Sequence, residues 1–151
     1  MTLIKEINIS NRENAEKVLA IQLPSYKVEA EIIGFDDIPP LKDTVSTLQQ
    51  CGESFFGYFS DEELCGFISF KKDDNIIDIH RLVVHPNYFK KGIAQELFDF
   101  LEGHVDSSLV KVATGSKNTP AVRFYLKNGF VVVREVTVNE RLSLSFFEKR
   151  R

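Results

Sequence analysis

The sequence predicts an α/β (α+β) fold, with helices on both faces of a mixed, mostly antiparallel sheet of about seven strands. Three observations support this prediction. Three strand-like segments follow one another between residues 55 and 85, separated only by short polar turns. A segment with apolar residues at helical spacing, from Ile93 to Leu101, comes next. A short strand, a second helix and a terminal hairpin then complete the chain, which gives one packed arrangement of sheet and helices.

The first third of the chain is expected to contribute one strand and two helices. Leu3–Ile9 alternates between apolar and polar residues, which is typical of a strand. The run Ser10-Asn11-Arg12-Glu13 has the form of a capping box, so a helix is expected to begin there. Pro24 is expected to end or bend that helix. Residues 25–50 are the least regular part of the sequence, with a short helix expected at Asp43–Gln50.

The central segment is expected to form an antiparallel meander. Its strands are Phe55–Phe59, Leu64–Phe70 and Ile76–His85, and polar turns at residues 60–63 and 73–75 separate them. A helix is then expected at Lys90–Glu102, with Gly103 as its C-terminal cap. The next strand is expected at Leu109–Thr114.

The last third begins with a helix that has clear terminal signals. Thr119 is expected to cap it, with Pro120 in the first helical position. It is expected to run to about Asn128 and to end at Gly129, where Phe130 can make the hydrophobic cap contact. The two remaining strands are Val131–Val138 and Leu142–Phe147, paired as a hairpin around Asn139-Glu140.

Composition excludes several classes of function. The chain has 151 residues, which fits a single domain over 1–151, and a net charge of −3 argues against a nucleic-acid-binding protein. Its two cysteines, Cys51 and Cys65, have no metal-like spacing, so no metal is expected. With no membrane-length apolar run and no signal-peptide pattern, we expect no membrane partner and a cytoplasmic location. A homodimer is possible, and the sequence does not decide it.

The segment Leu82–Ala94 has features of an anion-binding site. A strand runs into a short turn, and a helix starts at Gly92. The first N–H groups of a helix are unpaired and carry the positive end of its dipole. Gly92 would let a phosphate approach the backbone, and Lys90 and Lys91 add positive charge. Taken alone, this short pattern favours an ordinary strand–turn–helix with a loop glycine, and a diphosphate site is the alternative.

A second segment, Asn118–Phe130, has the pattern Asn-x-x-Ala-x-x-Phe-Tyr-x-x-x-Gly-Phe. With Leu82–Ala94, which is similar to an Arg/Gln-x-x-Gly-x-Gly/Ala core, it resembles two motifs of the GNAT family of N-acetyltransferases. The motifs lie between Ile76 and Phe130, while the order of elements resembles that family over nearly the whole chain. Phe89 departs from the pattern because it stands where the family usually has Arg or Gln.

The resemblance implies a GNAT-like sheet and acetyl-coenzyme A as co-substrate. It implies that the backbone at the start of the helix holds the diphosphate. It further implies that the strand before the turn pairs with the pantetheine arm, having splayed away from Leu109–Thr114. Asn118 would contact the cofactor near the mouth of that cleft. The implied cofactor-binding residues are Leu82, Val83, Val84, Lys90, Lys91, Gly92, Ile93, Ala94 and Asn118.

The resemblance also implies direct transfer of the acetyl group to a small-molecule or peptide amine in a ternary complex. Tyr125 occupies the position where the family commonly carries its general acid. Asp78 and His80 align with catalytic carboxylates or histidines of family members, so one of them is expected to accept the amine proton. As neighbours at i and i+2 they should share a strand face with Leu82 and Val84. The alternative is that they pair with each other structurally.

Two further expectations concern the oxyanion and the acceptor. A backbone N–H near Val83 or Val84 is the expected oxyanion donor if the strand bulges there. The resemblance implies that residues 26–41 and the hairpin around Asn139 line the acceptor site. The first of these regions is acidic, which could attract a cationic amine or be ordinary solvated surface; its carboxylates are Glu29, Glu31, Asp36 and Asp37.

Two other functions remain compatible with the sequence. A non-catalytic module could bind coenzyme A as a sensor or scaffold, because only Tyr125, Asp78 and His80 distinguish an enzyme from such a module. An unrelated α/β domain could bind a different phosphate-bearing ligand at the start of the helix.

Overall fold

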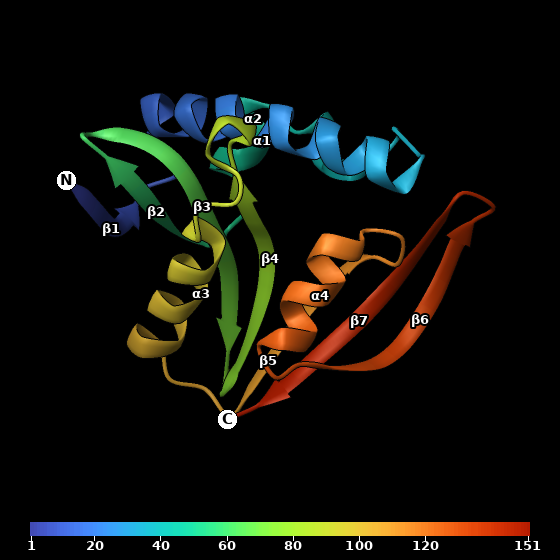
Figure 1. Cartoon of the computed structure of the whole chain (residues 1–151). Coiled ribbons are helices and arrows are strands. Elements are labelled where there is room, and N and C mark those ends of the chain that lie inside the picture. The colour runs from blue at the N-terminus through green and yellow to red at the C-terminus, as the bar shows by residue number, and fades with distance from the viewer.

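A computed structural model describes residues 1–151 and contains seven strands, four α-helices and two 3₁₀ turns (Figure 1). The strands are β1 (Thr2–Ile7), β2 (Ser54–Ser60), β3 (Glu63–Asp73), β4 (Ile76–Val84), β5 (Leu109–Gly115), β6 (Val131–Asn139) and β7 (Leu142–Arg150). The α-helices are α1 (Arg12–Ile33), α2 (Val45–Gln49), α3 (Ile93–His104) and α4 (Thr119–Lys127), and the 3₁₀ turns are Pro39–Lys42 and Pro86–Tyr88.

All seven strands form one sheet in the order β1-β2-β3-β4-β5-β7-β6. Every neighbouring pair is antiparallel except β4 and β5, which are parallel and are connected through α3. The predicted fold class, the antiparallel meander and the terminal hairpin are therefore confirmed. Strand β6 lies at an edge of the sheet and is exposed along its whole length.

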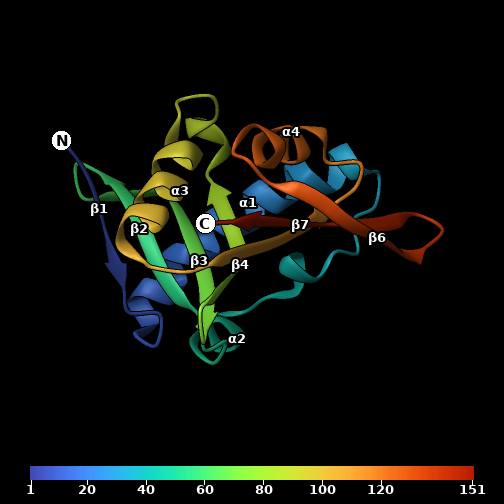
Figure 2. The same cartoon turned by 90° about the horizontal axis from the view of Figure 1, so that it is seen from below.

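Helices cover both faces of the sheet, and each face has its own hydrophobic core. Helices α3 and α4 lie on one side, while α1 and α2 lie on the other (Figure 2). The α3–α4 core consists of Phe56, Tyr58, Cys65, Ile68, Phe70, Ile77, Ile79, Ile93, Leu97, Phe98, Leu101, Val110, Val112, Tyr125, Phe130 and Phe147. The α1–α2 core consists of Ile9, Ala15, Val18, Ile21, Leu48, Phe55, Leu64, Phe67 and Val83.

Helix α1 corrects two sequence-based predictions. It continues through Pro24 without ending and runs to Ile33, so much of the segment expected to be irregular is helical. Pro24 removes only the hydrogen bond to the carbonyl of Ala20, and Ala20 is exposed, so water can satisfy that carbonyl. The helix is capped by Asn11, whose side chain accepts from the N–H of Asn14, and not by Ser10.

Two other helix ends also differ from their predictions. Gly103 lies inside α3, which begins at Ile93 and has Val105 as its C-terminal cap residue. Asn118, rather than Thr119, caps α4, because its side chain accepts from the N–H of Ala121. The predicted end of α4 is confirmed: Gly129 has a φ of 91°, and the N–H of Phe130 donates to the carbonyl of Tyr125.

Strands β4 and β5 pair over four residues only and then separate. Their last paired residues are Ile79 and Val112. Beyond that point β5 continues along β7 while β4 continues along β3, so the sheet divides into two halves. In Figure 1 the β6–β7 half leans away from the β2–β4 half. We call this divergence the split; it is the separation that the sequence motifs implied.

A β-bulge in β4 lies next to the split. Ser69 of β3 pairs with Arg81 and Phe70 pairs with Ile79, which leaves His80 as the extra residue. The bulge is therefore at His80, and the pairing with β3 stays regular at Val83 and Val84, where the expected oxyanion donor depended on a bulge. It reverses the alternation of the strand, because Ile79 belongs to the α3–α4 core and Leu82 and Val84 pack against that same core. The prediction that Asp78, His80, Leu82 and Val84 share one face is wrong.

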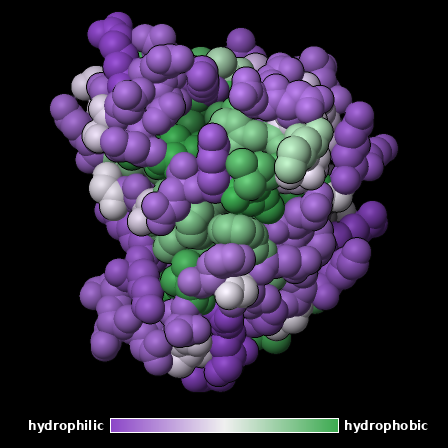
Figure 3. Space-filling view, turned by 90° about the vertical axis from the view of Figure 1, so that its left-hand side faces the viewer, coloured by the Kyte–Doolittle hydropathy of each residue, from purple (hydrophilic) through white to green (hydrophobic).

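On the side of the molecule where β1 lies, apolar side chains gather near the middle and polar ones surround them (Figure 3). None of the helices is both long enough and apolar enough to cross a membrane. The sequence motifs and the split point instead to the start of α3 and the end of β4 as the candidate site.

Candidate active site

The start of α3 presents backbone donors that the protein does not use. None of the N–H groups from Lys90 to Ala94 donates a hydrogen bond to another protein group. Gly92, the N-terminal cap of α3, has a φ of 79°, and a Cβ atom placed on it would meet nothing within 4 Å. Unpaired amides at an open, glycine-lined helix start are suited to bind a diphosphate.

The side chains around these amides are compatible with an anion. Lys90 and Lys91 are exposed, and neither forms an ion pair with a carboxylate. The ammonium of Lys91 lies 5.8 Å from the centre of the Tyr88 ring. Phe89, which replaces the usual Arg or Gln, is 40% exposed and can donate no hydrogen bond from its side chain. The two lysines supply the positive charge that Phe89 lacks.

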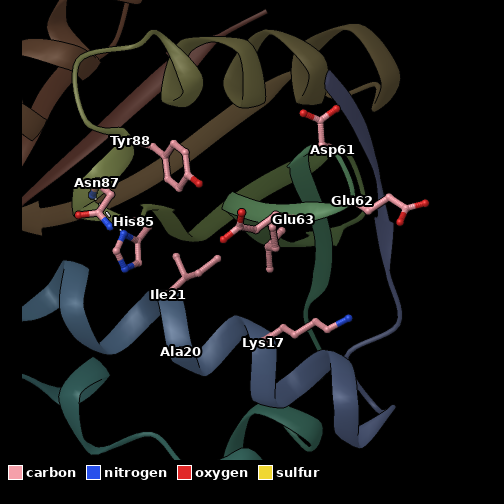
Figure 4. Close-up of a pocket in the computed structure, with 10 residues that line it drawn as sticks. Lys17, Ala20, Ile21, Asp61, Glu62, Glu63, His85, Asn87 and Tyr88 are labelled. Atoms are coloured by element: carbon pink, nitrogen blue, oxygen red, sulfur yellow. Dashed lines mark hydrogen bonds between the residues drawn. The ribbon is translucent and has the colours of Figure 1, made fainter. Parts of the chain in front are cut away.

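A separate pocket lies between α1 and the loop that leads from β4 to α3 (Figure 4). Three consecutive carboxylates of the β2–β3 turn, Asp61, Glu62 and Glu63, line it, and Lys17 is its one lysine. Negative charge at this density repels a diphosphate. The start of α3 is therefore the better candidate for the anion-binding site.

Helix α1 crosses the split and contacts both halves of the sheet. Its first half packs in the α1–α2 core against β2, β3 and β4. Near its end, Ile33 packs so closely on Gly115 of β5 that an added Cβ would lie 2.6 Å from Ile33 Cδ1. Glu29, one turn earlier, accepts a hydrogen bond of 2.6 Å from Asn118 Nδ2. Because α1 and α4 lie on opposite faces, this bond joins them across the end of the split.

Tyr125 of α4 is 6% exposed, and its ring packs in the α3–α4 core between Phe130 and Phe147. Its hydroxyl makes no hydrogen bond within the protein. Only Gln22 Oε1 is both unpartnered and fully shielded from solvent, so the hydroxyl of Tyr125 keeps some contact with solvent. Burial, followed by the negative charge of Glu29, raises the pKa of Tyr125 well above its ordinary value. Tyr125 therefore stays protonated at neutral pH and can act only as a proton donor.

Glu29 is a half-buried carboxylate that forms no ion pair within the protein. Burial raises its pKa, and the hydrogen bond from Asn118 opposes that shift. Of the four carboxylates expected to make this region acidic, Glu31, Asp36 and Asp37 are exposed, whereas Glu29 is not. Asn118 was expected to contact the cofactor; in this structure its side chain caps α4 and holds Glu29.

Asp78 and His80 lie on the α1–α2 side of β4 and contact each other. His80 Nε2 is 3.7 Å from Asp78 Oδ2, and His80 Nδ1 is 3.4 Å from Glu53 Oε2. The side chain of His80 is 34% exposed and that of Asp78 is 56% exposed. Both ring nitrogens of His80 therefore face carboxylates.

Sequence reasoning missed the charged network that supports His80. Arg81 donates to Glu53 Oε1 at 2.6 Å and to Asp43 Oδ2 at 3.1 Å. Ser69 donates to the same oxygen of Glu53. The bulge at His80 is the cause, because it turns Arg81 to the α1–α2 side, where strict alternation would have placed it on the opposite face.

Comparison with known proteins identifies the family to which these motifs point. The model of the acetyltransferase (GNAT) family matches residues 15–130. The structure of the ribosomal-protein-S18-alanine N-acetyltransferase from Escherichia coli is similar, with a TM-score of 0.77 at 14% identity, over 99% of this chain and 94% of that one. The PaiA N-acetyltransferase from Thermoplasma acidophilum, solved in complex with coenzyme A, has a TM-score of 0.68 at 23% identity, over 100% and 99% of the two chains. At these identities the likeness shows the fold alone.

A closer relative in sequence is the UPF0157 protein YqkA of Bacillus subtilis (strain 168). It is 42% identical over 134 residues, which is 88% of this chain and 39% of that protein. The chain thus spans well under half the length of this relative.

Replacing Glu29 with glutamine tests the burial of its carboxylate. A raised pKa means that the folded protein holds the carboxyl proton of Glu29 more tightly than the unfolded chain does. In an unfolded chain a glutamate has a pKa of about 4.3. The contribution of Glu29 to stability is therefore fully present below that pH and is lost as pH rises through the folded-state pKa. We expect calorimetry to show that Glu29→Gln gains melting temperature relative to wild type as pH rises from about 4 to neutrality.

The matched control is Glu31→Gln, because Glu31 is exposed on the same helix. Its difference from wild type should stay flat over the same pH range. A flat difference for Glu29→Gln as well would contradict the burial of the carboxylate.

Proposed function

The chain belongs to the GNAT acetyltransferase family, and we propose that it transfers the acetyl group of acetyl-coenzyme A directly to a primary amine within a ternary complex. The unused amides from Lys90 to Ala94 are the observation that carries this proposal, because they are donors without acceptors at an open helix start. The comparison with YqkA leaves the activity a proposal, since that relative is much longer than this chain.

The residues at the start of α3 and along the end of β4 fit the co-substrate. The amides from Lys90 to Ala94 would hold the diphosphate, with Lys90 and Lys91 adding charge. Leu82, Val83 and Val84 lie beyond the last β4–β5 pair, so this stretch of backbone has no strand on its β5 side. A pantetheine arm carries amides that can pair with such an edge. Acetyl-coenzyme A supplies the activated thioester when it is bound.

The alternation of β4 indicates which amide faces the developing oxyanion. The N–H of His85 donates to Cys65 of β3. Neighbouring residues of a strand direct their N–H groups to opposite edges, so the N–H of Val84 points toward the split. Of the two expected oxyanion donors, Val83 and Val84, the geometry supports Val84.

The amine has to lose a proton before it can attack. An alkylammonium group has a pKa of about 10.4, so an alkylamine is mostly protonated at neutral pH. His80 and Asp78 lie on the α1 side of the sheet and are partly exposed, so water can reach both. We assign them the role of accepting the amine proton through water, with Glu53 orienting His80.

Tyr125 would complete the reaction by protonating the leaving thiolate. Its hydroxyl is unpartnered and protonated, which suits a general acid. The same groups separate an enzyme from a module that only binds coenzyme A. Such a module would bind the cofactor but would release no coenzyme A thiol when incubated with acetyl-coenzyme A and a panel of primary amines.

The variant Ala94→Pro tests the use of the α3 amides. Ala94 is the second residue of α3, and proline is tolerated in the first turn of a helix, as Pro120 is at the second position of α4. The variant deletes one donor without breaking a protein hydrogen bond. Loss of a hydrogen bond to a charged group should weaken acetyl-coenzyme A binding about tenfold in titration calorimetry.

Ala94→Ser is the control, because it keeps the N–H and should bind like wild type. Wild-type protein should also gain about 2.7 kcal/mol of stability at a ligand concentration 100 times the dissociation constant. If Ala94→Pro binds as tightly as Ala94→Ser, the N–H of Ala94 does not hold the diphosphate.

The variant Tyr125→Phe tests the general acid. It removes a hydroxyl without a protein partner, so the melting temperature should change little. Turnover should fall by roughly 100-fold or more, the usual range for general acid catalysis, while KM for acetyl-coenzyme A stays near its wild-type value. Full turnover in this variant would assign the proton donor elsewhere.

The variants His80→Ala and Asp78→Asn test the route of the amine proton. A histidine base gives kcat/KM an acidic limb near its pKa, ordinarily about 6.5. We expect that limb to shift or vanish in both variants when the rate is measured from pH 5 to 9, a range of about two units on either side of neutrality. An acidic limb that persists unaltered in both would exclude them from the proton route.

A further inference from the structure

Strand β6 carries a large share of the apolar surface that the protein exposes. All of its residues, Val131–Asn139, are exposed, and it pairs only with β7. It is the outermost strand of its half of the sheet (Figure 1). Five of the ten large hydrophobic side chains that are exposed belong to this strand: Val131, Val132, Val133, Val136 and Val138. An apolar edge without a partner is suited to bind another strand.

The hydrogen bonds of β7 indicate which backbone groups of β6 point away from the sheet. The carbonyl of Ser143 in β7 accepts from the N–H of Ser116, which lies on the β5 side. The N–H and C=O of a strand residue point to the same edge, so Ser143 makes no backbone bond to Thr137, its neighbour in β6. The N–H and C=O of Thr137 therefore point to the free edge. Those of Glu135, two residues earlier, do the same.

Two β-bulges limit the part of β6 that can accept a further strand. The register with β7 shifts at Val133 and at Val138, which are the extra residues. Between them, Arg134–Thr137 pairs regularly with Ser143–Phe146. Because a bulge twists an edge strand, pairing is discouraged beyond this stretch. The available edge is therefore short and defined at both ends.

We propose that β6 pairs with β6 of a second copy of this chain, antiparallel about a two-fold axis at Val136. In this register Glu135 of each copy lies opposite Thr137 of the other, and the two residues exchange both of their backbone hydrogen bonds. Val136 lies opposite its own counterpart between these pairs. The sheet then continues from one copy into the next, and the valines at the junction lose contact with water.

The charges and bulges of β6 exclude the neighbouring registers. A two-fold axis perpendicular to the sheet keeps each side chain on its own face, so the axis has to pass through a residue. An axis at Glu135 would place two carboxylates opposite each other, and an axis at Arg134 would do the same with two guanidinium groups. An axis at Thr137 would place the bulged residue Val138 in the pair next to the axis. The axis at Val136 avoids all three conflicts.

A second copy is the occupant because this pairing closes on itself. Each β6 presents to its counterpart the same groups that it meets, which gives an isologous dimer with no free β6 edge. The other edge of the sheet is β1, which carries the charged residues Lys5 and Glu6. Pairing of β6 with β1 of another molecule would leave a free edge at each end and would build an open chain of molecules.

The first test is sedimentation equilibrium of the wild-type chain and of Thr137→Pro. Wild type should form a dimer of the 17.3 kDa chain. Thr137→Pro removes an N–H that faces the free edge and that β7 does not use, so the fold should be kept. The dissociation constant of the dimer should rise about tenfold or more. The control Thr137→Val keeps the N–H and should dimerise like wild type.

The second test is a disulfide at the axis, in a chain whose partly exposed Cys51 is replaced by serine. Val136 and its counterpart form a pair without backbone hydrogen bonds, whose Cα atoms lie about 4.5 Å apart, within the range of a disulfide. Val136→Cys should therefore give a cross-linked dimer on mild oxidation. Thr137→Cys faces Glu135 and should remain uncross-linked. This test keeps every backbone N–H, so it applies even if Thr137→Pro does not fold.

The outcomes test both the partner and the register. A wild-type chain that stays monomeric up to roughly 1 mM would overturn the dimer. A dimer that a folded Thr137→Pro leaves intact, or one that cross-links at residue 137 and not at residue 136, would overturn the pairing through this edge. Neither measurement uses acetyl-coenzyme A, so a failure here leaves the proposed acetyl transfer untouched.

Discussion

The rest of the structure depends on where β4 and β5 stop pairing. After Ile79 and Val112 the two strands follow different neighbours, and the backbone of β4 is left without a partner on one edge. Such an edge is normally a liability, because its N–H and C=O groups are unsatisfied. The fold maintains it with a bulge at His80 and with α1, which packs across both halves of the sheet. The split is thus held open by packing, and ligand binding can satisfy the groups that folding leaves free.

Two half-buried charged groups on the α1 side of the sheet, Arg81 and Glu29, differ in whether the protein compensates their charge. Arg81 is enclosed by Glu53 and Asp43 and supported by Ser69, so its charge is compensated within the protein. Breaking such a buried pair costs about 3–5 kcal/mol, which makes this network a rigid support for His80. Glu29 has only the amide of Asn118, and the charge of its carboxylate is uncompensated. One substitution could remove the carboxylate of Glu29 and its cost in stability. A destabilising group of this kind is expected where function requires it.

The sequence predicted the second half of the chain better than the first. The start of α3 and the end of α4 carry local signals, Gly92 and Gly129, whose positive φ values only glycine adopts freely. Pro24 gave the opposite signal, because its local cost was outweighed by the apolar face that α1 buries on both sides of it. Continuing the helical period past Pro24 places Glu29 seven residues after the buried Gln22, on the inner face. The bulge at His80 left one trace, the two successive polar residues His80 and Arg81 between the core residues Ile79 and Leu82, but regular alternation was expected through it.

The raised pKa of Tyr125 makes the transfer of its proton to the thiolate less favourable. A phenol whose pKa lies far above that of a thiol, about 8.5, gives its proton to a thiolate only against a free-energy difference. Two causes maintain that difference, burial first and the charge of Glu29 second. Neutralising the charge of Glu29 would remove the second cause and bring the pKa of Tyr125 closer to that of the thiolate, which links Glu29 of α1 to the general acid on the other face of the sheet.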